Sequence, residues 1–142
     1  MNPGDPFNLS RFLQAQERSY ETALAELKRG SKQSHWMWFI FPQIAGLGSS
    51  PTAQFYAIQS RAEAEAYSAH PILGPRLIAC AEALLGIEGK SALEIMGSPD
   101  DLKLRSSATL FAAIAPTGPI FHLLLDKFFG GEPDPRTLEI LR

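Results

Sequence analysis

Apolar residues recur at intervals of three and four along most of the chain, which is the spacing of one face of an α-helix. The clearest case lies near the N-terminus, where Leu9, Phe12 and Leu27 belong to one such series and Gly30 follows its last turn. A glycine just after the last turn is typical of a helix end. The pattern therefore predicts a long amphipathic helix over residues 8–29.

Start and stop signals divide the rest of the chain into shorter predicted helices. Ser60 and Ser91 are each followed by an acid three residues later, and Ser98 precedes a proline that suits a first helical position. Glycines and prolines mark the ends. These signals predict helices over residues 61–69, 72–85, 91–97, 99–115, 120–129 and 136–141, with a turn of helix within residues 51–58.

The segment from His35 to Gln43 is dense in large apolar side chains and holds both tryptophans of the chain. Its aromatic content also suits a strand. We favour a short buried helix over residues 36–41, capped by Ser34 and ended by Pro42, because no second strand pattern is present to pair with it. The sequence thus predicts an all-α fold of about eight helices with no significant sheet.

Length and composition indicate one globular domain over residues 1–142, with residues 1–6 as a loose lead-in. Apolar residues make up 45% of the chain and charged residues 20%, and the net charge of −2 argues against a general nucleic-acid-binding protein. No signal peptide or membrane-spanning run is recognisable, and Cys80 is the single cysteine. We expect a cytoplasmic protein that binds neither nucleic acid nor membrane, and the oligomeric state stays open.

Several segments resemble one bacterial family, the domain of unknown function family 1810. They include SHWMWFIFPQ from Ser34 to Gln43, HPILG from His70 to Gly74, PDDLKLRSS from Pro99 to Ser107, and FFGG from Phe128 to Gly131. The resemblance covers nearly the whole chain and implies a compact all-helical fold, without an assigned activity. The label calpastatin that is sometimes attached to this family does not suit the chain, because calpain inhibitors are disordered repeats and this composition is globular.

The two tryptophans point to a candidate ligand site. Trp36 and Trp38 cannot face the same way on a helix, because neighbours on one face lie three or four residues apart. We expect one of them in the core and the other beside a cleft, where it would stack a planar ligand while His35 and Gln43 supply hydrogen bonds. The alternative is that the whole segment only fills the core.

Positive charge and hydroxyl groups complete the predicted site. Lys32 lies just before the aromatic segment, and Lys103, Ser106 and Ser107 fall on one side of a predicted helix. These groups suit an anion, although a solvated helix face is the alternative. The predicted function is binding of a planar, anionic, nucleotide-like molecule in a cleft beside residues 35–43. Its predicted ligand-binding residues are Lys32, His35, Trp36, Trp38, Gln43, Lys103, Ser106 and Ser107.

Two other functions remain open at this point. An enzyme could use His35 as a general acid or base, although no catalytic residue is identified and whether the protein is an enzyme stays undecided. A protein-interaction module could use the exposed tryptophan with Phe55 and Tyr56 as anchors.

The sequence predicts neither a metal site nor a cofactor. His122 and Asp126 are spaced like a metal-binding pair but lack a third ligand. The glycines at positions 46 and 48 lack the spacing of a dinucleotide-binding loop. Cys80, on an apolar helix face, is expected to be an inert small hydrophobic residue.

Overall fold

The computed structural model describes residues 4–114 and 117–142 and confirms the all-α class over these residues. No strand is present in this part of the chain, where an isolated bridge joins Ile44 and Ile58. The nine helices found there are α1 (Ser10–Arg29), α2 (Met37–Ile40), α3 (Pro51–Tyr56), α4 (Arg61–Ala69), α5 (Leu73–Leu85), α6 (Ala92–Met96), α7 (Asp100–Ala112), α8 (Ile120–Phe129) and α9 (Pro135–Leu141).

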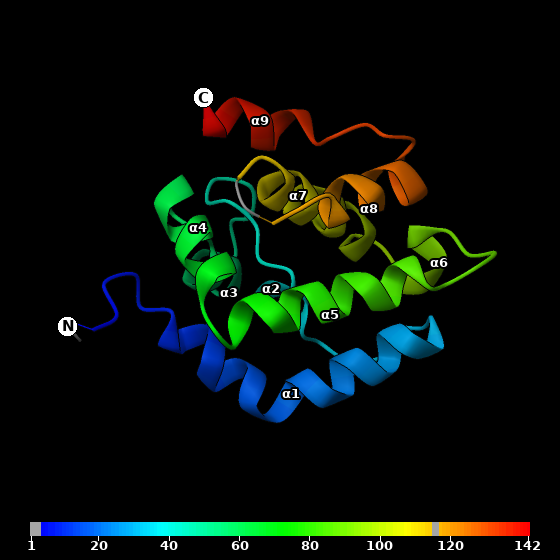
Figure 1. Ribbon diagram of the computed structural model, residues 1–142, viewed down its shortest axis with the longest axis horizontal. Coiled ribbons are helices and arrows are strands. Elements are labelled where there is room, and N and C mark those ends of the chain that lie inside the picture. The colour runs from blue at the N-terminus through cyan, green and yellow to red at the C-terminus, as the bar shows by residue number, and fades with distance from the viewer. Residues whose placement is uncertain (1–3, 115–116) are drawn as a thin grey trace.

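The longer helices pack in successive layers. In Figure 1, α1 lies at the bottom, α5 runs beside it, α7 and α8 follow, and α9 covers the top. The pairs α1–α5, α5–α8, α7–α8 and α7–α9 are all in direct contact. The short helix α2 buries Met37, Phe39 and Ile40, so the aromatic segment lies inside the bundle, whereas α3 has no buried residue.

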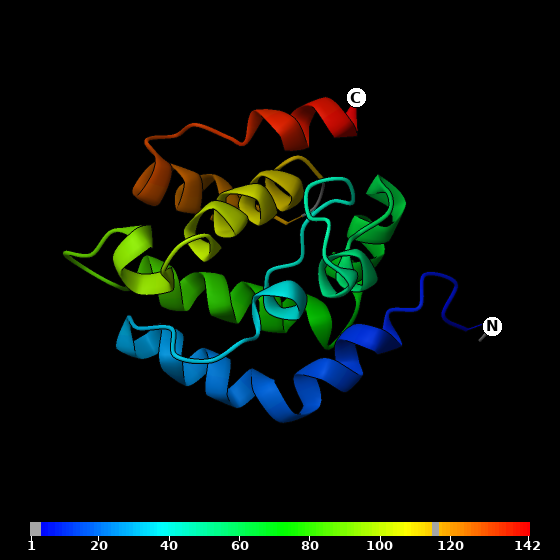
Figure 2. The same ribbon diagram turned by 180° about the vertical axis from the view of Figure 1, so that it is seen from behind.

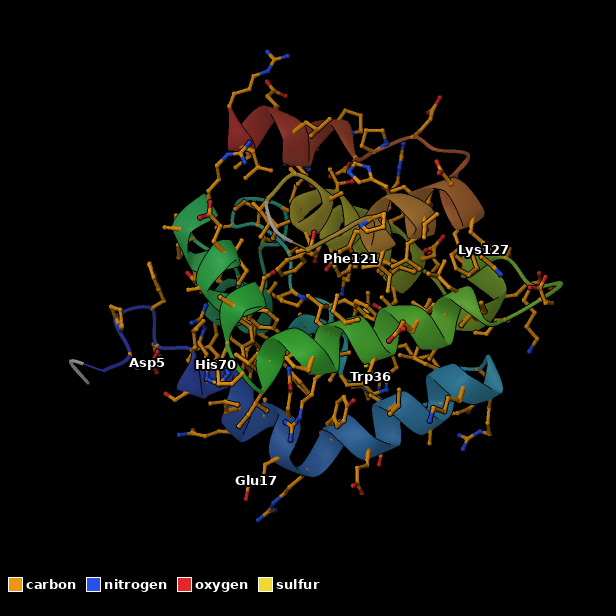
Figure 3. All side chains as sticks on the ribbon, in the orientation of Figure 1. Asp5, Glu17, Trp36, His70, Phe121 and Lys127 are labelled. Atoms are coloured by element: carbon orange, nitrogen blue, oxygen red, sulfur yellow. The ribbon has the colours of Figure 1, made fainter. Side chains whose placement is uncertain are left out.

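Helix α2 lies in the middle of the helical bundle. Figure 2 shows it from behind, between α1 and α7. Trp36, just before α2, is 1% exposed, and Figure 3 shows it pointing into the interior, as Phe121 of α8 does, while Glu17 of α1 points away. The predicted helix over residues 36–41 is therefore confirmed as a buried helix, two residues shorter than expected, and the strand alternative is wrong.

Two predicted helix caps are wrong. The hydroxyl of Ser34 donates a hydrogen bond to Glu26, and Trp36 occupies the N-cap position of α2. Helix α7 has Pro99, and not Ser98, at its N-cap, and backbone carbonyl groups of Gly97 and Pro99 accept hydrogen bonds from N–H groups of its first turn. Helix α7 ends at Ala112, before the predicted end at residue 115, which itself lies outside the described residues.

The N-terminal segment is held to the helical bundle by a buried ion pair. Arg11 of α1 lies 2.6 Å from the carboxylate of Glu63 of α4, and their side chains are 8% and 2% exposed. The same guanidinium donates to the carbonyl oxygens of Phe7, Asn8, Phe55 and Ala57. Residues 1–3 of the predicted lead-in lie outside the described part, whereas Asp5 accepts hydrogen bonds from the first N–H groups of α1.

Candidate functional site

The loop between α1 and α2 is organised by a buried carboxylate. Glu26, in the last turns of α1, is 2% exposed and accepts hydrogen bonds from Gln33 N at 2.7 Å, Ser34 N at 3.0 Å and Trp36 Nε1 at 2.9 Å. The Ser34 hydroxyl donates to its second oxygen. One acidic side chain thus fixes the path of residues 31–36.

These hydrogen bonds determine the charge state of Glu26. Burial alone would raise the pKa of this carboxyl, because the charged form loses its hydration. Donors from Ser34, Gln33 and Trp36 outweigh burial and lower the pKa from 4.5 to about 2. Glu26 is therefore ionised at neutral pH, and its negative charge stabilises the loop.

Lys32 is held in place by this loop and by the start of α7. Its backbone N–H donates to the carbonyl of Ile95 at 2.8 Å, and its ammonium group donates to the carbonyl of Ser34. The same ammonium lies 2.9 Å from Asp100 Oδ2 and 4.8 Å from the centre of the Trp36 ring. Its side chain is only 7% exposed, so Lys32 places a positive charge at a largely dry position.

Lys103 faces Lys32 across the same aspartate. Its Nζ lies 3.5 Å from Asp100 Oδ1 and 5.2 Å from the centre of the Trp38 ring. A cation over an indole face is an attractive arrangement. Asp100 therefore bridges two lysines, each of which also contacts a tryptophan.

A cavity of about 250 Å³ opens beside these groups. It lies between the loop before α2, the first half of α2 and the start of α7. Four of the residues predicted from sequence meet there, two of them from the loop, one from α2 and one from α7. The lining residues are Lys32, His35, Met37, Trp38, Ser98, Pro99, Asp100 and Lys103.

The structure places the other predicted residues elsewhere. Trp36 is buried beneath Lys32, and Gln43 lines a separate space of about 10 Å³ on another side of Trp38. Ser106 donates to Asp134 Oδ2 at 3.2 Å, and Ser107 is 0% exposed. The expectation that these serines share the cleft with Lys103 is not met, because they lie one turn further along α7, where α9 and the core cover them.

The cavity also contains residues that sequence reasoning missed. Asp100 is one of them, although its position three residues before Lys103 indicates a pair on one helix face. Its contact with Lys32 joins positions far apart in the chain. The spacing of residues along a helix cannot predict a contact of this kind. The glycine- and serine-rich loop after Gln43 does not line this cavity.

The other features singled out in the sequence lie away from this cavity. His122 lines an apolar cavity of about 280 Å³ between α7, α8 and α9. Across the described residues, no cluster of three or more histidine, cysteine, aspartate or glutamate side chains is placed to hold a metal ion. Burial raises the pKa of the Cys80 thiol to about 12. None of the helices in the described ranges is both long enough and apolar enough to span a bilayer.

Fold and cavity together define a small all-α protein with a pocket lined by lysine, histidine and tryptophan. The chain belongs to the family described as "Protein of unknown function (DUF1810)", whose model matches residues 6–141. It is also similar to a solved structure, the conserved hypothetical protein Rv1873 from Mycobacterium tuberculosis, with 50% identity and a TM-score of 0.95 over 96% of this chain and 98% of that one. A search of curated proteins gives no match.

Proposed function

We propose that the protein binds a small anionic molecule with a planar group in the cavity between the loop before α2 and the start of α7. The observation that carries this proposal is the convergence of Lys32, His35, Trp38 and Lys103 on one cavity. Ammonium groups attract anions, and an indole face stacks planar groups. Core filling alone explains Trp36, which is buried, but it does not explain two lysines at the same opening.

The charges around the cavity favour an anion. Lys32 and Lys103 carry two positive charges against the single negative charge of Asp100, which leaves a net charge of +1 among the described lining residues. Lys32 is nearly buried, and electrostatic interactions are stronger where water is excluded. The exposed imidazole of His35 adds a further hydrogen-bonding group at the edge.

The size of the cavity limits what can enter. Its volume of about 250 Å³ is slightly below the roughly 300–1,000 Å³ of typical ligand pockets. We therefore propose that only part of a nucleotide-like ligand is enclosed. Its anionic group contacts the lysines, its planar group lies against Trp38, and the remainder stays in solvent.

Calorimetric titration with adenosine monophosphate, adenosine and inorganic phosphate tests this proposal. We expect adenosine monophosphate to bind more tightly than either fragment, because it alone carries both recognised groups. Lys103→Ala should weaken its binding about tenfold, the loss expected when one partly screened charge is removed. Absence of binding at millimolar concentrations of all three compounds would refute the proposal.

Lys127→Ala is the matched control for Lys103→Ala. Both lysine side chains are 26% exposed, both lie near a carboxylate, and both lie over an aromatic ring, at 5.7 Å for Lys127 and Phe128. Lys127 belongs to α8 and does not line the cavity. Equal loss of affinity in the two variants would show that the effect is one of general charge.

A protein-interaction module is the second candidate, and one observation favours it. Phe55 is 56% exposed, and its ring packs at 4.8 Å against the ring of Tyr56. Exposed aromatic groups are common anchors of protein interfaces. A partner recovered from lysate that is lost with Phe55→Ala but kept with Lys103→Ala would support this function over ligand binding.

Catalysis by His35 and a bacterial cytoplasmic setting are further proposals. His35 lines the cavity and is exposed, so a general acid or base at this position can reach a bound ligand. Once a turnover is found, an unchanged rate in a folded His35→Ala variant would exclude this role. The single, buried cysteine supports a reducing compartment, which fractionation of the native host would test.

A further inference from the structure

The carboxylate of Asp100 occupies the position where a ligand's anion would interact with the two lysines. Its Oδ2 lies 2.9 Å from Lys32 Nζ, and its Oδ1 lies 3.5 Å from Lys103 Nζ. Both oxygens are therefore engaged, and the side chain is 18% exposed. The protein supplies its own anion at the centre of the candidate site.

Three of the backbone N–H groups in the first turn of α7 are already hydrogen-bonded within the chain. The N–H of Asp101 donates to Gly97 O at 2.9 Å, and those of Leu102 and Lys103 donate to Pro99 O at 3.0 and 3.2 Å. Free N–H groups at the N-terminus of a helix often bind phosphate. Here these three groups already donate to carbonyl groups of the chain. An anion would therefore be bound mainly by side chains, namely by the ammonium groups of Lys32 and Lys103.

A bound anion must compete with the carboxylate of Asp100 for the ammonium groups of Lys32 and Lys103, or contact them together with it. A ligand with a single negative charge gains little, because it replaces a carboxylate that is already held in place by the chain. A ligand with two negative charges interacts more strongly with both lysines than the single charge of Asp100 does. The arrangement thus discriminates by the charge of the ligand.

We propose, on the basis of the proposed function, that Asp100 is an internal competitor that lowers the affinity of the cavity for every anion, so that a phosphate monoester binds in spite of it only through its second negative charge. The ligand class is then a compound with a planar group and a terminal phosphate, which carries close to two negative charges near neutral pH. Asp100 weakens the binding of phosphodiesters and carboxylates as well, and these carry only one negative charge to offset that cost.

Titration with two nucleotides that share the same base tests the role of Asp100. Adenosine monophosphate carries a phosphate monoester, and cyclic adenosine monophosphate carries a singly charged diester. We expect the wild-type protein to prefer the monoester by about tenfold, the effect of one additional partly screened charge. Asp100→Asn should raise the affinity for both nucleotides, and for the cyclic nucleotide by about the same factor, because the competing charge is removed for each ligand.

Asp101→Asn is the matched control, since its carboxylate lies on the same turn and lines a different surface groove. It should behave as the wild type. If the wild type binds the monoester and Asp100→Asn does not gain affinity for the diester, the competitor role is refuted while the proposed function stands. If neither protein binds either nucleotide, both proposals fail.

A measurement on the wild-type protein covers the case in which Asp100→Asn does not fold. Carbon-13 NMR of the aspartate carboxyl groups should show a change at Asp100 on saturation with adenosine monophosphate, because its lysine partners move to the ligand. The signal of Asp101 should stay in place. An unchanged Asp100 signal at saturation would overturn the inference.

Discussion

Glu26 and Trp36 are joined by a hydrogen bond of 2.9 Å between the carboxylate and the indole nitrogen, and the two side chains are 2% and 1% exposed. This contact connects the core to the candidate site. Trp36 fills the interior and supports the ammonium group of Lys32 on its ring face, while Trp38 lines the cavity. Core filling therefore accounts for Trp36, whereas the proposed ligand contact concerns Trp38.

Stability should depend on pH through Glu26. Its pKa is lowered from 4.5 to about 2, so its contribution is present above pH 4.5 and is lost as the pH falls towards 2. The shift corresponds to roughly 3 kcal/mol of unfolding free energy. Urea unfolding of the wild type and Glu26→Gln between pH 7 and pH 2 should show this difference at pH 7 and a much smaller one at pH 2.

Glu17→Gln provides the control for this experiment. Glu17 lies on the exposed face of the same helix, so its removal should change stability by less than about 0.5 kcal/mol. A difference between the wild type and Glu26→Gln that stays constant with pH would contradict the assigned role of the buried charge.

Replacing Arg11 with methionine should destabilise the protein strongly. The change leaves the carboxylate of Glu63 buried without its cation, which typically costs about 3–5 kcal/mol. Denaturant unfolding measures the loss, and Arg18→Met on the exposed side of α1 is the control. The double variant Arg11→Met/Glu63→Met should recover part of the loss, and no recovery would argue against an unpaired charge as the cause.

Gly74 is expected to tolerate no side chain. A Cβ at this position of α5 would lie 2.2 Å from the carbonyl oxygen of Ser68 in α4, so Gly74→Ala must push the two helices apart. We expect a loss of about 1–3 kcal/mol in thermal or urea unfolding. Gly86→Ala is the control, because its nearest atom lies at 3.6 Å and its backbone is right-handed helical. Equal stability of the two variants would refute this packing.

The two tryptophans should differ in their access to solvent. Trp36→Phe leaves Trp38 as the single tryptophan, and Trp38→Phe leaves the buried Trp36. Acrylamide should quench the fluorescence of the first variant more strongly. Adenosine monophosphate should then protect Trp38 in that variant if the proposed stacking occurs, while equal quenching of both variants would contradict the arrangement.

The sequence by itself determined the class of fold and most helix boundaries. Apolar spacing, capping serines and glycines are local signals, and each acts within a few residues of the helix it starts or ends. For this reason the predicted helices over residues 61–69 and 120–129 agree with α4 and α8. The expectation that the two tryptophans face different sides also follows locally, whereas which of them is buried was decided only by the tertiary structure.

Only the tertiary structure decided which side chains form the candidate site. Lys32 meets Asp100 because α6 and α7 bring the chain back beside the loop before α2, and contacts of this kind depend on packing between distant segments. The same packing covers Ser106 and Ser107 with α9 and the core, although they lie on the helix that carries Lys103. Local spacing places residues on a helix face, but the neighbouring helices determine whether that face meets a cavity, another helix or solvent.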